Sequence, residues 1–142
     1  MPKNKSLKLI IDTNLWVSFI ISNKQNLLDS VFYSEEVRLL FSKELIDEIL
    51  QTITKPKLKK YFVTNALEEM ISTFDPFIDF VKVKSSISVC RDIKDNFLLA
   101  LANDGQADYL LTGDKDLLEL KKFGKTKICT IAHFIEETKS PR

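Results

Sequence analysis

Short apolar runs separated by longer segments with helical periodicity dominate the hydrophobic pattern of the chain. The first run, Leu7 to Ile11, is apolar on both faces, as expected of a strand buried in a parallel sheet. Similar runs predict further strands at 37–41, 80–83, 108–111 and 127–131.

Apolar residues at helical spacing predict helices in the segments between these runs. Ser42 stands where a helix N-cap would, and Glu44 lies in the favourable first turn, so a helix should run from there to Ile53. Other helices are expected at 15–21, 27–33 (after a break at 23–26), 65–77, 116–120 and 132–137. The segment that begins at Asp92 is apolar on every side over 97–102, which predicts a buried helix that ends near Asp104 and Gly105. Strands that alternate with helices indicate an α/β fold with a mainly parallel sheet.

The size and composition of the chain favour one packed domain. Its 142 residues are close to the usual size of a single domain, and no internal repeat interrupts them. The hydrophobic fraction is 44%, and only three Gly and four Pro are present, which is typical of a globular protein. We therefore expect a single domain over residues 1–142.

Charge and cysteine content narrow the functional classes. The 21 basic and 20 acidic residues nearly cancel, so any nucleic-acid surface must be local. Cys90 and Cys129 are far apart and only one histidine is present, which excludes the usual zinc ligand sets and suggests core cysteines in a reducing cytosol. The apolar run at 7–11 is too short for a signal peptide or a membrane span. A soluble, cytoplasmic protein is the expectation.

Acidic residues gather at the ends of the predicted strands. In open parallel sheets the ligand site lies beyond the carboxyl ends of the strands. Asp12 closes the first strand, and Asp92 and Asp95 open the buried helix. Asp114 and Asp116 flank the turn after the fourth strand, so three separate segments bring carboxylates to one edge of the sheet.

The helix after the second predicted strand contributes one more acidic candidate. Asp47 and Glu48 border its apolar stripe on opposite flanks, while Glu44 points away from it. Periodicity alone does not choose between Asp47 and Glu48.

Converging carboxylates need a cation. Like charges about 4 Å apart repel by roughly 4 kcal/mol at an effective dielectric constant of 20. With no histidine or cysteine nearby, the oxygen ligands suit Mg²⁺ or Mn²⁺. This arrangement is typical of metal-assisted phosphodiester hydrolysis, in which the metal lowers the pKa of a water and no protein nucleophile is needed.

Each of these acids also has a structural explanation. Asp12 can be a turn residue that ends its strand, and Glu48 can be a solvated helix residue. Asp92 can be an N-cap that Asp95 answers in a capping box. Asp116 can cap its short helix while Asp114 serves the turn at Gly113. The convergence of the acids, rather than any single one, favours the catalytic interpretation.

Several neighbouring residues allow more than one interpretation. Asn14 and Thr112 can orient the acids or satisfy turn backbone, and both interpretations stay open. His133 is expected to be a local structural or surface residue, and Trp16 to be part of the core. Two basic clusters can neutralise RNA phosphates, but a solvated charged face is the favoured explanation, so neither cluster is assigned. They comprise Lys55, Lys57, Lys59, Lys60 with Tyr61, and Lys121, Lys122, Lys125 and Lys127.

Two ordered motifs resemble the PIN-domain family. One is the strand at 9–11 that ends in Asp-Thr-Asn at 12–14, and the other is the Ala-Asp strand from 107 that leads to Thr-Gly-Asp-Lys-Asp-Leu-Leu at 112–118. The segments Ser-Lys-Glu-Leu-Ile-Asp-Glu at 42–48 and Asp-Ile-Lys-Asp-Asn at 92–96 lie between them in the same order. The resemblance covers nearly the whole chain, about 7–137, and is closest to the toxin branch of toxin-antitoxin systems (VapC-like ribonucleases).

The resemblance implies both a fold and a set of functional residues. The acidic metal ligands and catalytic residues of the family fall on Asp12, Glu48, Asp95, Asp114 and Asp116. This chooses Glu48 over Asp47, but it does not show which of Asp114 and Asp116 binds metal directly. It also implies a three-layer α/β/α sandwich, Mg²⁺ or Mn²⁺ dependence, endonucleolytic cleavage of RNA and, in the toxin branch, a partner antitoxin. Whether the active form is a homodimer is left open.

Two other functions compete with a ribonuclease. A phosphohydrolase with Asp12 as nucleophile would need a second Asp two positions on, where this chain has Asn14. A catalytically silent PIN-like interaction module would keep the acids for structural reasons, and it would bind no Mg²⁺ in the millimolar range.

Overall fold

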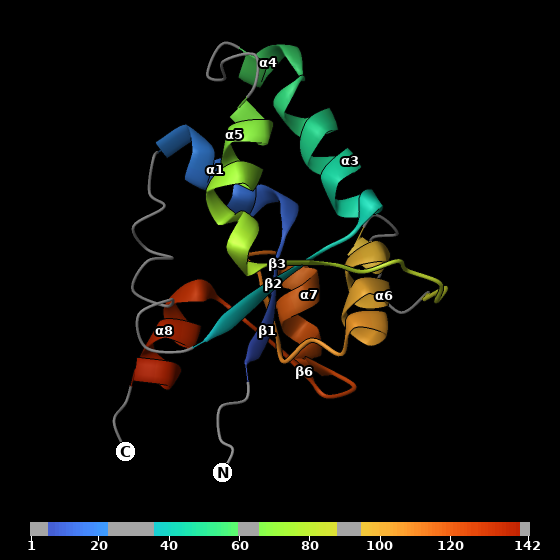
Figure 1. The fold of residues 1–142 in the computed structure, drawn as a ribbon. Helices are drawn as coiled ribbons and strands as arrows, with labels where there is room; N and C mark the ends of the chain where they lie inside the picture. The colour runs from blue at the N-terminus through green and yellow to red at the C-terminus, as the bar shows by residue number, and fades with distance from the viewer. Residues whose placement is uncertain (1–5, 23–35, 60–65, 88–94, 140–142) are drawn as a thin grey trace.

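The computed structural model describes residues 6–22, 36–59, 66–87 and 95–139, which form a six-stranded sheet with helices on both faces (Figure 1). The strand order is β3-β2-β1-β4-β6-β5. The parallel strands are β1 (Leu7–Ile11), β2 (Val37–Phe41), β3 (Ile78–Phe80), β4 (Tyr109–Leu111) and β6 (Thr126–Cys129). A short antiparallel strand, β5 (Lys122–Phe123), was not predicted. The predicted α/β fold with a mainly parallel sheet is confirmed, with six strands rather than about five.

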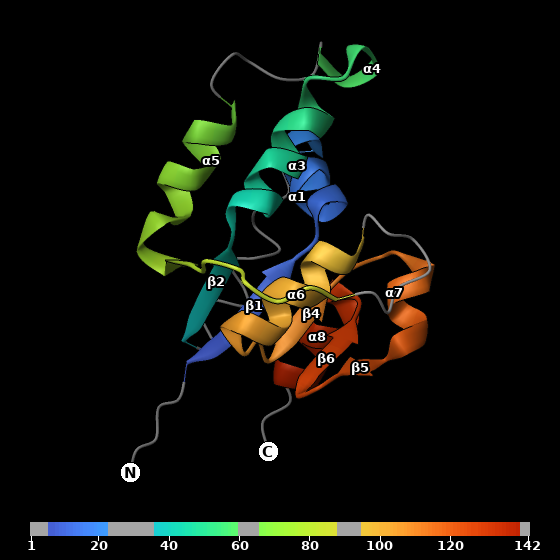
Figure 2. The ribbon, with the colours of Figure 1, turned by 90° about the vertical axis from the view of Figure 1, so that its right-hand side faces the viewer.

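The helices build the layers around this sheet. Helix α6 (Asn96–Gly105) lies on one face and α8 (Ile131–Lys139) on the other (Figures 1 and 2). Helices α1 (Thr13–Ser22), α3 (Lys43–Ile53) and α5 (Ala66–Phe74) extend beyond the carboxyl edge of the sheet. The short helices are α4 (Pro56–Lys59), the 3-10 turn η1 (Asp75–Phe77) and α7 (Lys115–Leu120).

Local sequence explains the most regular of these elements. The Ser42 hydroxyl accepts a hydrogen bond from the Leu45 N–H at 3.1 Å, so Ser42 caps α3 as predicted. Trp16 is buried in the core, as expected, and its ring centroid lies 5.4 Å from that of Phe41 and 5.7 Å from that of Phe74. These contacts join α1, β2 and α5 into one aromatic cluster above the sheet.

The third strand begins two residues earlier than predicted and ends at Phe80. The Arg38 guanidinium pairs with Asp79 at 2.6 Å, and the Val81 N–H donates to the Phe41 carbonyl at 2.8 Å, which fixes this register. The chain then leaves β2, because the backbone N–H groups of Lys84 and Ser85 donate to Asp104 on α6. The predicted strand at 80–83 was therefore wrong over most of its length.

Several other predicted boundaries need correction. The basic connector at 57–61 begins as helix α4, the helix predicted at 65–77 ends at Phe74 and continues as η1, and the last strand ends at Cys129. Cys129 is buried, as expected. His133 is exposed, and its Nε2 lies 3.2 Å from the Glu137 Oε1. The helix predicted at 27–33, the break before it, Cys90 and Asp92 lie outside the described residues.

Candidate active site

Asp12 connects the end of β1 to the start of α1. One of its carboxylate oxygens accepts a hydrogen bond from the Leu15 N–H at 2.8 Å, and the other accepts one from the Thr112 hydroxyl. The side chain is only 5% exposed. Burial is the main reason that the pKa of Asp12 is raised above its ordinary value. The charge of Asp114 raises it further, against the lowering effect of hydrogen bonds from Thr112, Leu15 and the Gly113 backbone.

Thr112 and Asp114 bring the end of β4 next to Asp12. The Thr112 hydroxyl donates to Asp12 and accepts the Asp114 N–H at 2.9 Å, so one buried hydroxyl connects the two acidic residues. A carboxylate oxygen of Asp114 accepts the N–H groups of Asp116 at 2.7 Å and Leu117 at 3.4 Å. Asp114 is therefore the N-cap of α7, and the alternative in which Asp116 caps this helix is wrong.

Glu48 reaches the same region from α3. The buried face of α3 includes Leu45 and Ile49, and it packs against α1. This packing turns Glu48 toward Asp12, whereas Asp47 lies on the outer side and pairs with Lys43 at 3.0 Å. The spacing of apolar residues had left this choice open because Asp47 and Glu48 border the stripe equally.

Asp95 stands directly before the first residue of α6, at the N-cap position. Its backbone is already helical and its side chain makes no capping hydrogen bond to the helix. The capping-box hypothesis, in which Asp95 answers an N-cap at Asp92, stays a prediction. Its predicted partner in that box, Asp92, lies outside the described residues.

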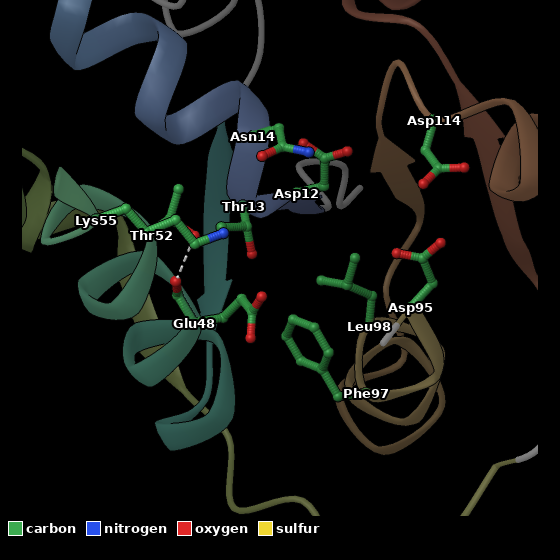
Figure 3. A pocket seen from close by; sticks show the side chains of 10 residues that line it. All are labelled: Asp12, Thr13, Asn14, Glu48, Thr52, Lys55, Asp95, Phe97, Leu98 and Asp114. Atoms are coloured by element: carbon green, nitrogen blue, oxygen red, sulfur yellow. Dashed lines mark hydrogen bonds between the residues drawn. The ribbon is translucent and has the colours of Figure 1, made fainter. Parts of the chain in front are cut away.

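These elements enclose a cavity of about 180 Å³ at the carboxyl edge of the sheet (Figure 3). Four of the five predicted acids line it, and Asp116 does not. The lining residues are Asp12, Thr13, Asn14, Glu48, Thr52, Lys55, Asp95, Phe97, Leu98 and Asp114. In Figure 3 the carboxylates of Glu48, Asp95 and Asp114 face the open space below Asp12. We refer to this space as the carboxylate cavity.

Comparison with known proteins assigns this arrangement to a family. The model of the PIN domain matches residues 8–116, which include all four acids of the carboxylate cavity. The chain belongs to the PIN-domain family. A protein of Methanocaldococcus jannaschii described as uncharacterized protein MJ1680 is 30% identical over 143 residues, which cover 92% of this chain and 91% of that protein. PIN domains are generally nucleases and typically use divalent metal ions.

The carboxylates around the cavity of this PIN domain suit a hydrated divalent cation as metal ligands. The negatively charged side chains around the carboxylate cavity are carboxylates, which are ligands that Mg²⁺ and Mn²⁺ prefer. Among the described residues, no three acidic, histidine or cysteine side chains are close enough to form a ready metal site. The acids surround the cavity instead, and Mg²⁺ usually keeps several waters while contacting only one or two carboxylates. The cavity far exceeds the roughly 15 Å³ that one water needs.

Thr13 and Lys55 line the carboxylate cavity, although neither was assigned to the site from the sequence. The Thr13 hydroxyl is buried and has no hydrogen-bond partner among the described residues. Lys55, from the first basic cluster, extends its ammonium group toward the space between Thr13 and Glu48 (Figure 3). Thr13 directly follows Asp12, so the sequence could have placed it in the site. The position of Lys55 could not be predicted in this way, because it depends on where α3 ends.

Within the described ranges, no helix combines the length and the apolarity needed to cross a membrane.

Proposed function

We propose that this PIN domain is a metal-dependent endoribonuclease that hydrolyses RNA phosphodiester bonds. The observation that carries the proposal is the meeting of Asp12, Glu48, Asp95 and Asp114, from four separate chain segments, around one cavity. Without a bound cation, these four carboxylates would destabilise the folded protein, because burial and the charge of Asp114 both disfavour the charged form of Asp12. A divalent cation removes this cost.

The chain's own residues supply the binding and orientation that the reaction needs. Asp12, Glu48, Asp95 and Asp114 would hold the cation, and Thr112 fixes the relative orientation of Asp12 and Asp114. A divalent cation, when bound, lowers the pKa of a water and stabilises the negative charge that develops on the phosphate. We assign the direct role to Asp114 rather than Asp116, because only Asp114 lines the cavity.

Lys55 and Thr13 would position the phosphate. The Lys55 ammonium lies on the opposite side of the carboxylate cavity from Asp95 and Asp114, where it can neutralise a non-bridging phosphate oxygen (Figure 3). The buried Thr13 hydroxyl can donate a hydrogen bond to the same group, which would satisfy a polar atom that is otherwise unpaired within the described structure.

Cleavage of an end-labelled RNA tests the proposal. With Mn²⁺ or Mg²⁺ the wild-type protein is expected to cut RNA at internal positions, and an excess of EDTA should lower the rate at least a hundredfold because the carboxylates alone activate no water. A DNA strand of the same sequence is the matched substrate control and should be cut much more slowly. Absence of cleavage with metal, or a rate that EDTA does not change, would contradict the proposal.

Thr13→Val tests the role proposed for the buried hydroxyl. The change keeps the shape of the side chain and removes an unpaired polar group, so the free energy of unfolding should stay the same or rise by about 1 kcal/mol. The kcat/KM for RNA should fall roughly tenfold or more, as expected for a lost hydrogen bond to a charged group. The control is Thr126→Val, whose buried hydroxyl donates to the Ala107 carbonyl far from the cavity. This control should lose stability and keep its activity; unchanged activity in Thr13→Val would remove Thr13 from the site.

We also propose that the ribonuclease is the toxin of a toxin-antitoxin pair. The support is the sequence resemblance in the Asp-Thr-Asn strand at 12–14 and in the segment at 112–118. Induced expression of the chain alone should then slow bacterial growth, and the Asp12→Asn variant should not. Equal growth with both proteins would leave the nuclease proposal standing and remove the toxin role.

A further inference from the structure

A second cavity of about 180 Å³ adjoins the carboxylate cavity, and the Phe97 side chain lines both. The second cavity lies between the start of α3, the start of α6 and the segment at 81–87 that follows β3. Its apolar lining is Val83, Ile87, Phe97 and Ala100, and its polar lining is Glu44, Ser85 and Asn96. Nothing in the proposed chemistry of the carboxylate cavity uses this space.

The outer wall of the second cavity is fixed in place although it has no regular secondary structure. The segment at 81–87 crosses α6 (Figure 2) and is held there by Asp104. This carboxylate accepts hydrogen bonds from the N–H groups of Lys84 and Ser85 and from the Ser85 hydroxyl. The hydrogen bond from the Ser85 hydroxyl is the main reason that the pKa of Asp104 lies well below its ordinary value. The attachment therefore holds Val83 and Ile87 beside α6.

We propose that the second cavity binds one nucleobase of the RNA strand, beside the phosphodiester bond that is cut. This proposal rests on the proposed nuclease function, which places a phosphate in the carboxylate cavity on the other side of Phe97. Single-stranded RNA is recognised mainly through unstacked bases that pack on aromatic rings and hydrogen-bond at their edges. The second cavity offers an aromatic ring, aliphatic walls and polar groups, and it is small compared with pockets for larger ligands, which usually exceed roughly 300 Å³.

Glu44 determines which bases fit best. It is an exposed acid in the first turn of α3, and an ionised carboxylate can only accept hydrogen bonds. It therefore favours a base with an exocyclic amino group, as when a carboxylate accepts from the amino group of cytosine. Cytosine, adenine and guanine carry such a group, whereas the N3–H donor of uracil lies between two carbonyl oxygens that an acceptor-only carboxylate repels. The second cavity should select against uracil at one nucleotide position next to the cut.

The test compares cleavage of short RNAs that differ only in the nucleotide next to the cut. Wild-type protein with Mn²⁺ should show a kcat/KM about tenfold higher for the best amino-bearing base than for uracil. Glu44→Gln, whose amide both donates and accepts, should bring this ratio to within about twofold of one. The matched control is Glu68→Gln, an exposed acid in the first turn of α5 away from both cavities, which should keep the wild-type ratio. An unchanged ratio in Glu44→Gln would overturn the proposal.

A second variant fills the cavity instead of changing its polarity. Ala100→Leu places extra methyl groups in the second cavity without altering any residue that lines the carboxylate cavity. Cleavage of base-bearing RNA should fall about fivefold or more, because base stacking is lost. An RNA with an abasic nucleotide at the same position should be cut equally by Ala100→Leu and wild type. Equal loss on both substrates, with an unchanged melting temperature, would contradict a base-binding role.

Binding of RNA in EDTA separates this proposal from the proposed function. If wild type cuts RNA but Glu44→Gln keeps the base preference in both cutting and binding, the base site is wrong and the nuclease function stands. In the opposite case, wild type cuts no RNA but binds oligonucleotides with an amino-bearing base more tightly than those with uracil, and Glu44→Gln loses this difference. The base site then stands and the nuclease function fails. If RNA is neither cut nor bound, or if both cavities accept a protein segment instead, both proposals fail.

Discussion

Asp12→Asn is expected to lower the rate of metal-dependent RNA cleavage at least a hundredfold while the protein stays folded. The new amide can still accept the Leu15 N–H, so the start of α1 is preserved, but the negative charge that would hold the cation is gone. Because burial disfavours this charge in the folded protein, the free energy of unfolding in EDTA should not fall by more than about 1 kcal/mol. Cleavage assays and urea unfolding of the two proteins provide the comparison.

The pH dependence of stability provides a control for this variant. The pKa of Asp12 is raised in the folded protein, so between the unfolded value of 3.8 and the raised value the folded state holds more protons than the unfolded state. The contribution of Asp12 to stability is therefore greatest below 3.8 and is lost as the pH rises through the raised pKa. As the pH rises through this range in EDTA, the unfolding free energy of the wild-type protein should therefore fall relative to that of Asp12→Asn. A difference that is constant with pH would mean that Asp12 is not destabilised by burial.

Glu48→Gln and Asp47→Asn form a matched pair with opposite expected results. Glu48→Gln should reduce RNA cleavage at least a hundredfold, because Glu48 faces the carboxylate cavity and its charge would help to hold the cation. Asp47→Asn should change the rate by less than about twofold. Asp47 pairs with Lys43 on the exposed side of α3, and such a surface pair adds little to stability.

Both variants of this pair should unfold within about 0.5 kcal/mol of the wild-type protein, since each changes a side chain on the surface of one helix. Activity and urea unfolding of the two proteins, measured together, therefore separate a functional effect from a structural one. Loss of activity in Asp47→Asn, or its retention in Glu48→Gln, would contradict the orientation of α3 on which the site depends.

The best-predicted parts of the fold are those that local sequence determines. Strand β1 is apolar on both faces, and α3 starts at a residue that caps it in the structure, so both were predicted within two residues of their observed bounds. The position of the acids also followed from the sequence, because parallel strands bring their carboxyl ends to the same edge.

The parts that were not predicted depend on contacts between distant residues. The apolar run around β3 fits several registers, and the choice rests on the Arg38 to Asp79 pair and on the attachment of Ser85 to Asp104. Strand β5 has only two residues, which is too short for a recognisable pattern. The choice of Asp114 over Asp116 as cap is local instead, and it depends on the N–H groups of Asp116 and Leu117 that the Asp114 carboxylate accepts.

Calorimetric titration of Mn²⁺ into wild type and Asp95→Asn is the most direct test of the central claim that acids from separate segments share one cation. Asp47→Asn serves as the matched control because it removes a nearby carboxylate outside the cavity. Wild type and Asp47→Asn should bind Mn²⁺ saturably in the millimolar range or better, and Asp95→Asn should bind at least tenfold more weakly. Equal binding by all three proteins, or no binding by wild type, would contradict the claim and favour an interaction module whose acids are structural.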